Sequence, residues 1–175
     1  MTMMPKAPDP AAGTASVSPE AFRAAMRGFM GVVSIMTVGR GEQATGLTVT
    51  TGSSLSAEPP MIFACINRTS SSFAVLKADG QFGWQVLGAQ HEALAHRFSG
   101  RTGVRGPDRY VGSEWLTMPT GVKLLADAPA AFDCAVEDMF DRETHTIVLG
   151  RVRAVHATDG RGSLLYRHSS YLILP

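Results

Sequence analysis

The stretch GLTVTTGSSLSAEPPMIFACI, residues 46–66, decides how this sequence is interpreted. It begins as an apolar strand, continues through a run of hydroxyl side chains and two prolines, and returns to an almost wholly apolar strand. In the simpler interpretation the threonines are β-formers and the serines are turn residues. In the other, hydroxyls and unpaired backbone N–H groups face a cleft that holds a planar, acceptor-rich heterocycle. The residues of this stretch alone favour the simpler interpretation.

Length and composition limit the classes of protein to consider. With 175 residues, 16 Lys plus Arg and 15 Asp plus Glu, we expect one domain over residues 18–175 and no nucleic-acid partner. Residues 1–17 are rich in proline, alanine and small polar residues, which predicts a disordered tail rather than a secretory signal. No apolar run approaches the ~20 residues of a membrane span, so we expect no membrane partner. Cys65 and Cys134 lie in apolar settings, which favours free thiols in the cytoplasm.

Flanking segments supply helices and further strands. Ser18, Pro19 and Glu20 form a helix start, and the residues that follow make an apolar helical face that we expect to cover another surface. Residues 31–39 predict a strand that forms a hairpin with the opening stretch. Short helices are expected over 67–80, with Gly80 as the left-handed stop, and over 89–100. Residues 101–121 predict a long surface loop.

The last third of the sequence carries the period of antiparallel strands. Apolar and polar residues alternate in FDCAVEDMF (residues 132–140) and VLGRVRAV (residues 148–155). No strand–helix–strand rhythm of a parallel sheet is sustained. The pattern therefore predicts a mainly β protein, a closed or nearly closed antiparallel barrel with a few peripheral helices.

Several familiar sites are excluded by spacing. His91 and His96 in HEALAH are five residues apart, about 140° round a helix, so they cannot share one metal ion. The sequence lacks CxxC, GxxxxGK[ST], GxGxxG and GxSxG, so zinc ribbons, phosphate loops, Rossmann domains and α/β-hydrolases lack their usual marks. We expect no metal site.

A resemblance changes the balance between the two interpretations of residues 46–66. Six blocks resemble, in order, successive blocks of the short-chain flavin reductase family: FRAAMRGFMGVVSIMTVG, GLTVTTGSSLSAEPPMIFACINRTSSSF, FGWQVLGAQHEALAHRFSG, AAFDCAVED, THTIVLGRV and LLYRHSSYLIL. They cover nearly everything except the tail. The resemblance implies an antiparallel Greek-key split β-barrel, the FMN-binding split barrel.

The resemblance also implies an activity and partners. Similar proteins oxidise NADH or NADPH and reduce FMN or FAD, often for a partner flavin-dependent monooxygenase, and are usually homodimers. Hydride transfer requires that the nicotinamide is positioned over the flavin and that the reduced ring is stabilised electrostatically. It does not require a catalytic triad.

Site residues carry over block by block as implications of the resemblance. Thr48, Thr50, Thr51 and Ser54 would lie along the flavin ring, and Asn67, Ser70 and Ser72 toward the ribityl chain and phosphate. Many relatives have asparagine where this sequence has Thr50, a difference that leaves backbone contacts intact. His145 would lie beside the nicotinamide–flavin stack and Tyr171 near the nicotinamide, although ETH replaces the family's GDH before the strand. Arg97 and Phe98 match the family's RF pair, or are a helix-end charge and a core aromatic.

Three alternatives remain open at this stage. The run FSGRTG followed by AAFDC also resembles flavin-dependent corrinoid (cobalt) reductases and the reductase of a pyrimidine-degrading oxygenase pair. A non-catalytic flavin- or haem-binding barrel could use His145 or His168 as an axial ligand. A pyridoxamine phosphate oxidase-like enzyme would be expected to carry more basic residues than the single Arg68 of NRTSSS.

Overall fold

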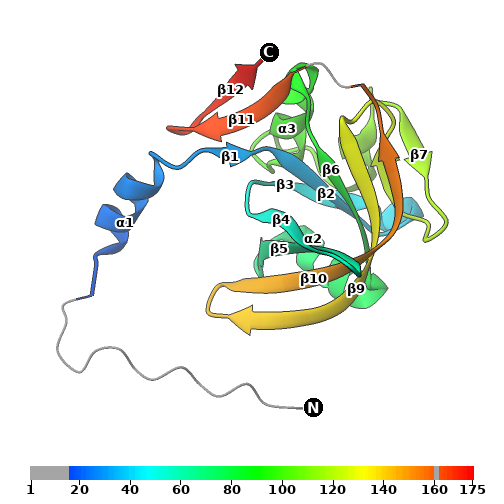
Figure 1. Ribbon diagram of the computed structural model, residues 1–175, viewed down its shortest axis with the longest axis horizontal. Coiled ribbons are helices and arrows are strands. Elements are labelled where there is room, and N and C mark those ends of the chain that lie inside the picture. Colours follow the sequence, from blue (N-terminus) through cyan, green and yellow to red (C-terminus); the bar gives the residue numbers. More distant parts are fainter. Residues whose placement is uncertain (1–15, 160–161) are drawn as a thin grey trace.

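A computed structural model describes residues 16–159 and 162–175 (Figure 1). The predicted tail therefore lies outside the described residues, apart from residues 16 and 17. The prediction of a mainly β, antiparallel fold is confirmed. The main sheet contains seven strands in the order β3 (Thr45–Val49), β2 (Ser34–Val38), β6 (Gln81–Val86), β9 (Ala130–Arg142), β10 (His145–Ala157), β5 (Pro60–Asn67) and β4 (Gly52–Ala57).

Smaller sheets and helices surround the main sheet. A three-stranded sheet has the order β1 (Gly31–Val32), β11 (Ser163–Arg167) and β12 (Ser170–Leu174), and β7 (Trp115–Thr117) pairs with β8 (Lys123–Leu125). The α-helices are α1 (Pro19–Met26), α2 (Ser71–Asp79) and α3 (Glu92–Phe98). Short 3-10 helices are η1 (Gly41–Gln43), η2 (Ala89–His91) and η3 (Gly106–Tyr110). Within the described residues, no helix is long and apolar enough to cross a membrane.

The connection between β3 and β4 shows that the main sheet is rolled into a barrel. These strands are the two edges of the sheet, yet only residues 50 and 51 separate them in the chain. Three residue steps reach at most ~11 Å, so the two edges must meet. We call residues 49–52, which join the edges, the seam. The stretch that opened the sequence analysis contains the place where the split barrel closes.

Two apolar clusters fill the fold. One contains Phe82 and Trp84 of β6 and Leu76 of α2, so it packs α2 against the barrel. The other contains Ile35, Phe98 and Leu124 and lies beside α3. Gly80 ends α2 with a φ of 66°, as the sequence predicts. The apolar residues that predicted the strands are thus the residues that pack in the interior.

The predicted surface loop of residues 101–121 is partly wrong. It contains η3 and β7, and it buries part of its aromatic surface. The Phe98 ring lies 5.3 Å from that of Tyr110 and 5.8 Å from that of Trp115, measured between centroids. Arg109 is only 6% exposed. The loop packs because these side chains cover the end of α3, which sequence spacing does not show.

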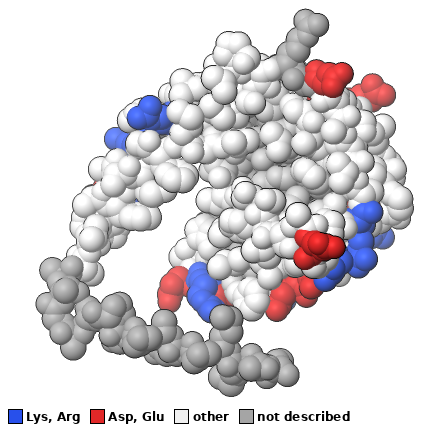
Figure 2. Space-filling model, in the orientation of Figure 1, with Lys and Arg blue, Asp and Glu red and all other residues white. Residues whose placement is uncertain are grey.

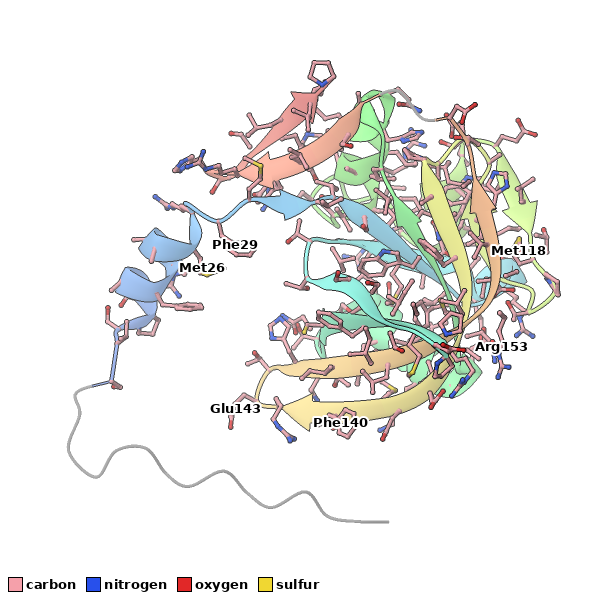
Figure 3. The ribbon with its side chains drawn as sticks, viewed as in Figure 1. Met26, Phe29, Met118, Phe140, Glu143 and Arg153 are labelled. Carbon is pink, nitrogen blue, oxygen red and sulfur yellow. The ribbon has the colours of Figure 1, made fainter. Side chains whose placement is uncertain are left out.

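Helix α1 forms as predicted, and its apolar face is left uncovered in the single chain. Ser18 caps it, with its Oγ accepting a hydrogen bond from the Ala21 N–H at 3.1 Å. None of the residues of α1 is buried, and Phe22 and Phe29 are 59% and 67% exposed. Figure 1 shows α1 standing away from the barrel, and Figure 2 shows a hollow between them. Met26, the last residue of α1, and Phe29, just after the helix, point toward this open side (Figure 3).

Candidate functional site

A cavity of about 210 Å³ lies beside the seam, and we call it the seam cavity. Three parts of the fold meet there: the end of β3, the turn after α3, and the β11–β12 hairpin. The lining residues are Thr48, Val49, Thr50, Ser99, Arg101, Tyr166 and Tyr171. Of the residues expected along the ring, the structure therefore brings Thr48 and Thr50 together with Tyr171.

The seam offers backbone donors. Thr50 and Thr51 lie between strands, and the Thr51 carbonyl accepts a hydrogen bond from the Cys65 N–H at 2.8 Å. Among the described residues, the loop and turn hydrogen bonds include neither the Thr50 N–H nor the Thr51 N–H as a donor. Thr50 lines the seam cavity, and Thr51 is the next residue in the chain. Backbone donors outside a ladder beside a cavity suit a ligand rich in acceptor atoms.

The side chains of Thr48, Thr50 and Thr51 make different contacts. The Thr48 hydroxyl donates to the Ala95 carbonyl at 2.6 Å, which ties β3 to α3. The Thr51 hydroxyl donates to the Cys65 carbonyl at 3.0 Å, which ties the seam to β5. No hydrogen bond of the Thr50 hydroxyl occurs among the described residues. Two threonines therefore hold the seam in place, and Thr50 presents a free hydroxyl beside the cavity.

Gly52 allows the seam to approach the core closely. A Cβ atom at this position would lie 2.3 Å from the Trp84 ring. Any side chain here would push the seam away from the indole. The glycine in GLTVTTGSS is thus a packing requirement of the seam.

The wall formed by β3 and α3 is fixed by a buried arginine. The Arg109 Nε donates to the Val104 carbonyl at 3.1 Å, and its Nη1 donates to the Phe98 carbonyl at 3.3 Å and to the Gly46 carbonyl. Burial lowers the pKa of Arg109. Because one side chain joins the loop, α3 and β3, it holds in position two of the elements that line the seam cavity.

The RF pair lies outside the seam cavity. Phe98 is 1% exposed and belongs to the core beside α3, so it supports the wall from behind. Arg97 is exposed, and its Nη1 donates to the Val111 carbonyl. It lines a separate cavity next to Gly112. Arg97 is thus a charge at the end of α3 and Phe98 is a core aromatic, which is the second of the two interpretations given for this pair.

The opposite wall is aromatic. The Tyr171 ring lies 5.3 Å from the Tyr166 ring and 4.8 Å from the His96 ring, between centroids, in edge-on arrangements. Burial raises the pKa of Tyr171, and the neighbouring Tyr166 adds to the shift. Tyr171 therefore stays protonated at neutral pH and can donate a hydrogen bond.

A second group of predicted residues lies at the end of β5. His145 is the residue opposite Asn67 in the β10–β5 ladder, and its Nδ1 lies 2.8 Å from the Thr144 Oγ1. The Asn67 Oδ1 accepts hydrogen bonds from the N–H and hydroxyl of Thr69, at 2.9 and 2.8 Å. The Ser70 hydroxyl, at the start of α2, is buried without a hydrogen-bond partner among the described residues. This group joins the seam through β5, because Cys65 pairs with Thr51 two residues before Asn67.

Two further predicted residues lie elsewhere. Ser72 is 1% exposed, packed on the buried side of α2. Ser54 lies on β4 and lines an apolar groove of about 360 Å³ with Trp84 and Val152. Neither lines the seam cavity in the single chain.

Sequence reasoning missed four residues of this site: Ser99, Arg101, Arg109 and Tyr166. Ser99 and Arg101 lie in the FSGRTG run and Tyr166 lies in the LLYRHSSYLIL block, but the resemblance assigned none of the three a role. Arg109 carried no signal, because a basic residue in a polar loop is usually exposed.

Comparison with known proteins identifies relatives of this chain. The family model described as flavin reductase like domain matches residues 26–175. The chain is 36% identical to FMN reductase (NADH) RutF 2 of Methylorubrum extorquens over 160 residues, which is 91% of this chain and 92% of that protein. It is 32% identical to FMN reductase (NADH) RutF of Bradyrhizobium diazoefficiens, over 89% of this chain and 85% of that protein.

Solved structures of flavin reductases also resemble this chain. The chain resembles BorF, the flavin reductase component of a bacterial two-component tryptophan halogenase, with a TM-score of 0.82, 28% identity, and coverage of 90% of this chain and 99% of that one. It also resembles the NADH:FAD oxidoreductase SgcE6 of Streptomyces globisporus C-1027, with a TM-score of 0.81, 26% identity, and coverage of 93% and 98%.

Proposed function

The chain belongs to the flavin reductase-like domain family, and we propose that it is an NAD(P)H:flavin oxidoreductase that reduces FMN or FAD. The observation that carries this proposal is the seam cavity, which is lined by Thr48, Thr50 and Tyr171 and lies beside the Thr50 and Thr51 N–H groups, which are outside the strand ladders. This donor set fits the acceptor-rich edge of a flavin ring. We assign the activity to a single domain of residues 18–175.

In the proposed mechanism the residues position two rings. When bound, the flavin would supply the hydride acceptor and the nicotinamide the hydride donor. The N–H groups of Thr50 and Thr51 hold one edge of the flavin and stabilise negative charge there. Arg101 adds positive charge to the same cavity, and Tyr166 and Tyr171 form the wall opposite β3. These residues orient and bind, and none of them has to move a proton.

The end of β5 is proposed to hold the ribityl and phosphate portion of the flavin. Support comes from the buried, unpartnered Ser70 hydroxyl at the start of α2, where backbone N–H groups favour anions. Asn67 shapes this turn through its bonds to Thr69, and Ser72 anchors α2 from the buried side. His145, opposite Asn67, is proposed as a neighbour of the reacting rings.

We further propose that two copies of the chain form a homodimer. The support is the exposed apolar surface that a single chain leaves uncovered, on α1 and on β12, where Leu172, Ile173 and Leu174 are 43%, 55% and 58% exposed. An eight-residue helix is also too short to be stable in water without packing partners. Ser54, in the apolar groove beside Trp84, would reach a flavin only in such an assembly.

A partner monooxygenase and a cytoplasmic location complete the proposal. The structural relatives include the reductase component of a two-component halogenase and component B of nitrilotriacetate monooxygenase. Cys65 and Cys134 are free thiols, which suits a reducing compartment.

The decisive experiment is anaerobic oxidation of NADH and of NADPH, followed at 340 nm, with FMN, FAD or riboflavin added or omitted. We expect flavin-dependent turnover. Folded protein that binds flavin but gives no turnover with any flavin would refute the reductase. The same assay with a corrinoid as acceptor would then test the cobalt-reductase alternative, and an absorbance spectrum would separate a flavin carrier from a haem protein.

A further inference from the structure

We propose that a second cavity, next to the seam cavity, binds a phosphate group of one of the nucleotide substrates. It has a volume of about 550 Å³ and lies between α1 and the turn of the β11–β12 hairpin, and we call it the α1 cavity. Tyr166 lines both cavities, so the two adjoin. The inference rests on the proposed function, since it assumes that a nucleotide ring occupies the seam cavity.

The α1 cavity is rich in positive charge. Arg23, Arg27, Arg167 and His168 line it, with Glu20 as the one acidic residue. The Glu20 carboxylate is paired with Arg23 at 2.7 Å. The ion pairs among the described residues include neither Arg27 nor Arg167. A protein with a formal net charge of +1 thus concentrates unneutralised cations at one cavity beside its candidate active site.

The backbone fixes this arrangement. The His168 N–H donates to the Arg27 carbonyl at 3.0 Å, and the Arg167 Nε donates to the Gly28 carbonyl at 3.2 Å. His168 and Ser169 form the hairpin turn with φ angles of 50° and 62°. These bonds join the end of α1 to the turn, so the side chains of Arg27, His168 and Ser169 line the same cavity.

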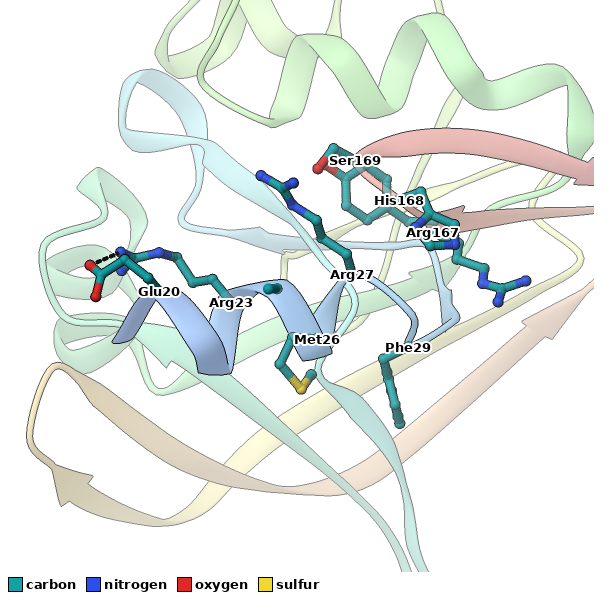
Figure 4. A pocket seen from close by; sticks show the side chains of 10 residues that line it. Glu20, Arg23, Met26, Arg27, Phe29, Arg167, His168 and Ser169 are labelled. Atoms are coloured by element: carbon teal, nitrogen blue, oxygen red, sulfur yellow. Dashed lines mark hydrogen bonds and ion pairs between the residues drawn. The ribbon is translucent and has the colours of Figure 1, made fainter. Parts of the chain in front are cut away.

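The donor set matches a phosphate. Figure 4 shows the Arg27 side chain reaching from α1 toward the turn that carries Ser169 and His168. The guanidinium and the hydroxyl are donors to phosphate oxygens, and the imidazole can be one. Met26 and Phe29 also line the α1 cavity, so its wall combines basic and apolar side chains. In Figure 4 these two side chains point away from Ser169, whereas Arg27 reaches toward it.

The positions of the cavities favour the nicotinamide nucleotide as the source of this phosphate. The seam leads along β5 to Ser70, where the flavin phosphate is proposed, and it leads past Tyr166 to Arg27 in the α1 cavity. Two nucleotides whose rings stack at the seam can therefore place their phosphates in opposite directions. Arg27 would hold the pyrophosphate of NADH or NADPH.

The test is the Arg27→Gln variant, assayed with NADH and with dihydronicotinamide riboside, which has no phosphate. We expect the KM for NADH to rise about tenfold, the effect of losing one charge-assisted contact, and the KM for the riboside to stay within about twofold. Arg27→Lys should restore part of the affinity. Arg153→Gln, an exposed position on β10 far from α1 (Figure 3), is the matched control and should behave as the wild type.

Parallel assays with FMN and riboflavin identify the source of the phosphate. A selective rise in the KM for FMN would keep the phosphate site and assign it to the flavin. If the KM for NADH and the KM for FMN both stay within twofold while turnover persists, the α1 cavity binds no substrate phosphate, and the reductase proposal is unaffected.

A binding measurement makes the test independent of activity. Calorimetric titration with inorganic pyrophosphate should give at least about fivefold weaker binding to Arg27→Gln than to the wild type or Arg153→Gln. Equal binding to all three would overturn the inference. Circular dichroism of each variant checks that α1 and the barrel are intact.

Discussion

The two walls of the seam cavity are held in different ways. The wall of β3 and α3 is tied by buried or half-buried bonds: Thr48 to Ala95, Tyr110 to Thr45, and Arg109 to three carbonyl groups. The wall of β11 and β12 is joined to the rest of the fold mainly by backbone bonds. β11 pairs with the two-residue strand β1, the Leu164 N–H donates to the Leu87 carbonyl at 3.0 Å, and the Leu164 carbonyl accepts from the Val33 N–H at 3.0 Å. Exposed bonds to the end of α1 complete this wall.

The two walls therefore differ in what completes them. The β3–α3 wall is completed by the folding of one chain, so the donors that we propose for the flavin ring are in place before any ligand binds. The β11–β12 wall and α1 expose apolar and basic surface that a single chain leaves uncovered. We therefore expect substitutions on the first wall to change stability, and substitutions on the second to change association and substrate affinity.

The largest expected effect is on the second wall. The double variant Phe22→Ser, Phe29→Ser should weaken the dimer about a millionfold, since the two copies together lose four exposed phenyl rings that each contribute ~2 kcal/mol when buried. Analytical ultracentrifugation over a dilution series measures this change. Val111→Ser, another exposed apolar residue outside α1, is the control. A double variant that dimerises as tightly as the wild type would show that α1 is not covered by the second copy.

The next effect is on the first wall. Arg109→Met should lower the free energy of unfolding by about 3 kcal/mol, because it leaves buried carbonyl groups without donors. Denaturant unfolding measures it, with the exposed Arg105→Met in the same loop as the control. If both variants lose the same small amount, Arg109 does not hold this wall.

A third substitution tests a residue outside both walls. His145→Ala should lower the turnover with NADH about tenfold and leave the flavin Kd within twofold, if His145 positions the nicotinamide rather than the flavin. Steady-state kinetics and flavin titration give the two values. An unchanged rate would remove His145 from the reaction site.

Two threonines, two residues apart, sharpen the comparison within the first wall. Thr48→Val should cost about 1 kcal/mol of stability, because the Ala95 carbonyl loses one of its two donors, the other being the Ser99 N–H. Thr50→Val should cost less than about 0.5 kcal/mol and change the flavin Kd less than threefold, since the backbone N–H remains. Thermal unfolding and flavin titration distinguish the two. A large loss of flavin affinity in Thr50→Val would show that the hydroxyl, not the backbone, makes the contact.

The smallest effect concerns pH. Burial raises the pKa of Tyr110, whose hydroxyl donates to the Thr45 carbonyl at 2.5 Å. Above pH ~10 the unfolded chain loses this proton while the folded chain keeps it, so stability falls as the pH rises. Between pH 9 and 10.5 the loss should be about 0.8 kcal/mol, and Tyr110→Phe should reduce it by that amount. Urea unfolding at each pH measures the difference, and an identical slope for both proteins would contradict this assignment.

Much of the fold could be predicted because the sequence signals are local. Alternation in residues 132–140 and 148–155 predicted β9 and β10, and Ser18 and Gly80 marked helix ends that the structure confirms. The long loop was misjudged because the burial of Tyr110 and Trp115 depends on Phe98, more than ten residues away in the sequence. The exposure of α1 was missed because amphipathicity shows that a helix has an apolar face, not what covers it.

The candidate site was predictable only in part. Hydroxyl-rich residues at the start of β4 and α2 drew attention to Thr50 and Ser70, and Thr50 lies at the seam cavity. The walls formed by Arg101, Arg109 and Tyr166 come from segments distant in the chain, and single basic or aromatic residues carry no signal in a sequence.

By itself, the sequence determined that this protein is a mainly β domain whose strands alternate in polarity, and that residues 46–66 contain its most polar interruption. These properties follow from side-chain period and backbone preference, which act over a few residues. Only the tertiary structure decided that this interruption is the seam of a barrel. The two strands it joins are neighbours in the chain and opposite edges of the sheet, so Thr48, Val49 and Thr50 line a cavity because the sheet closes there.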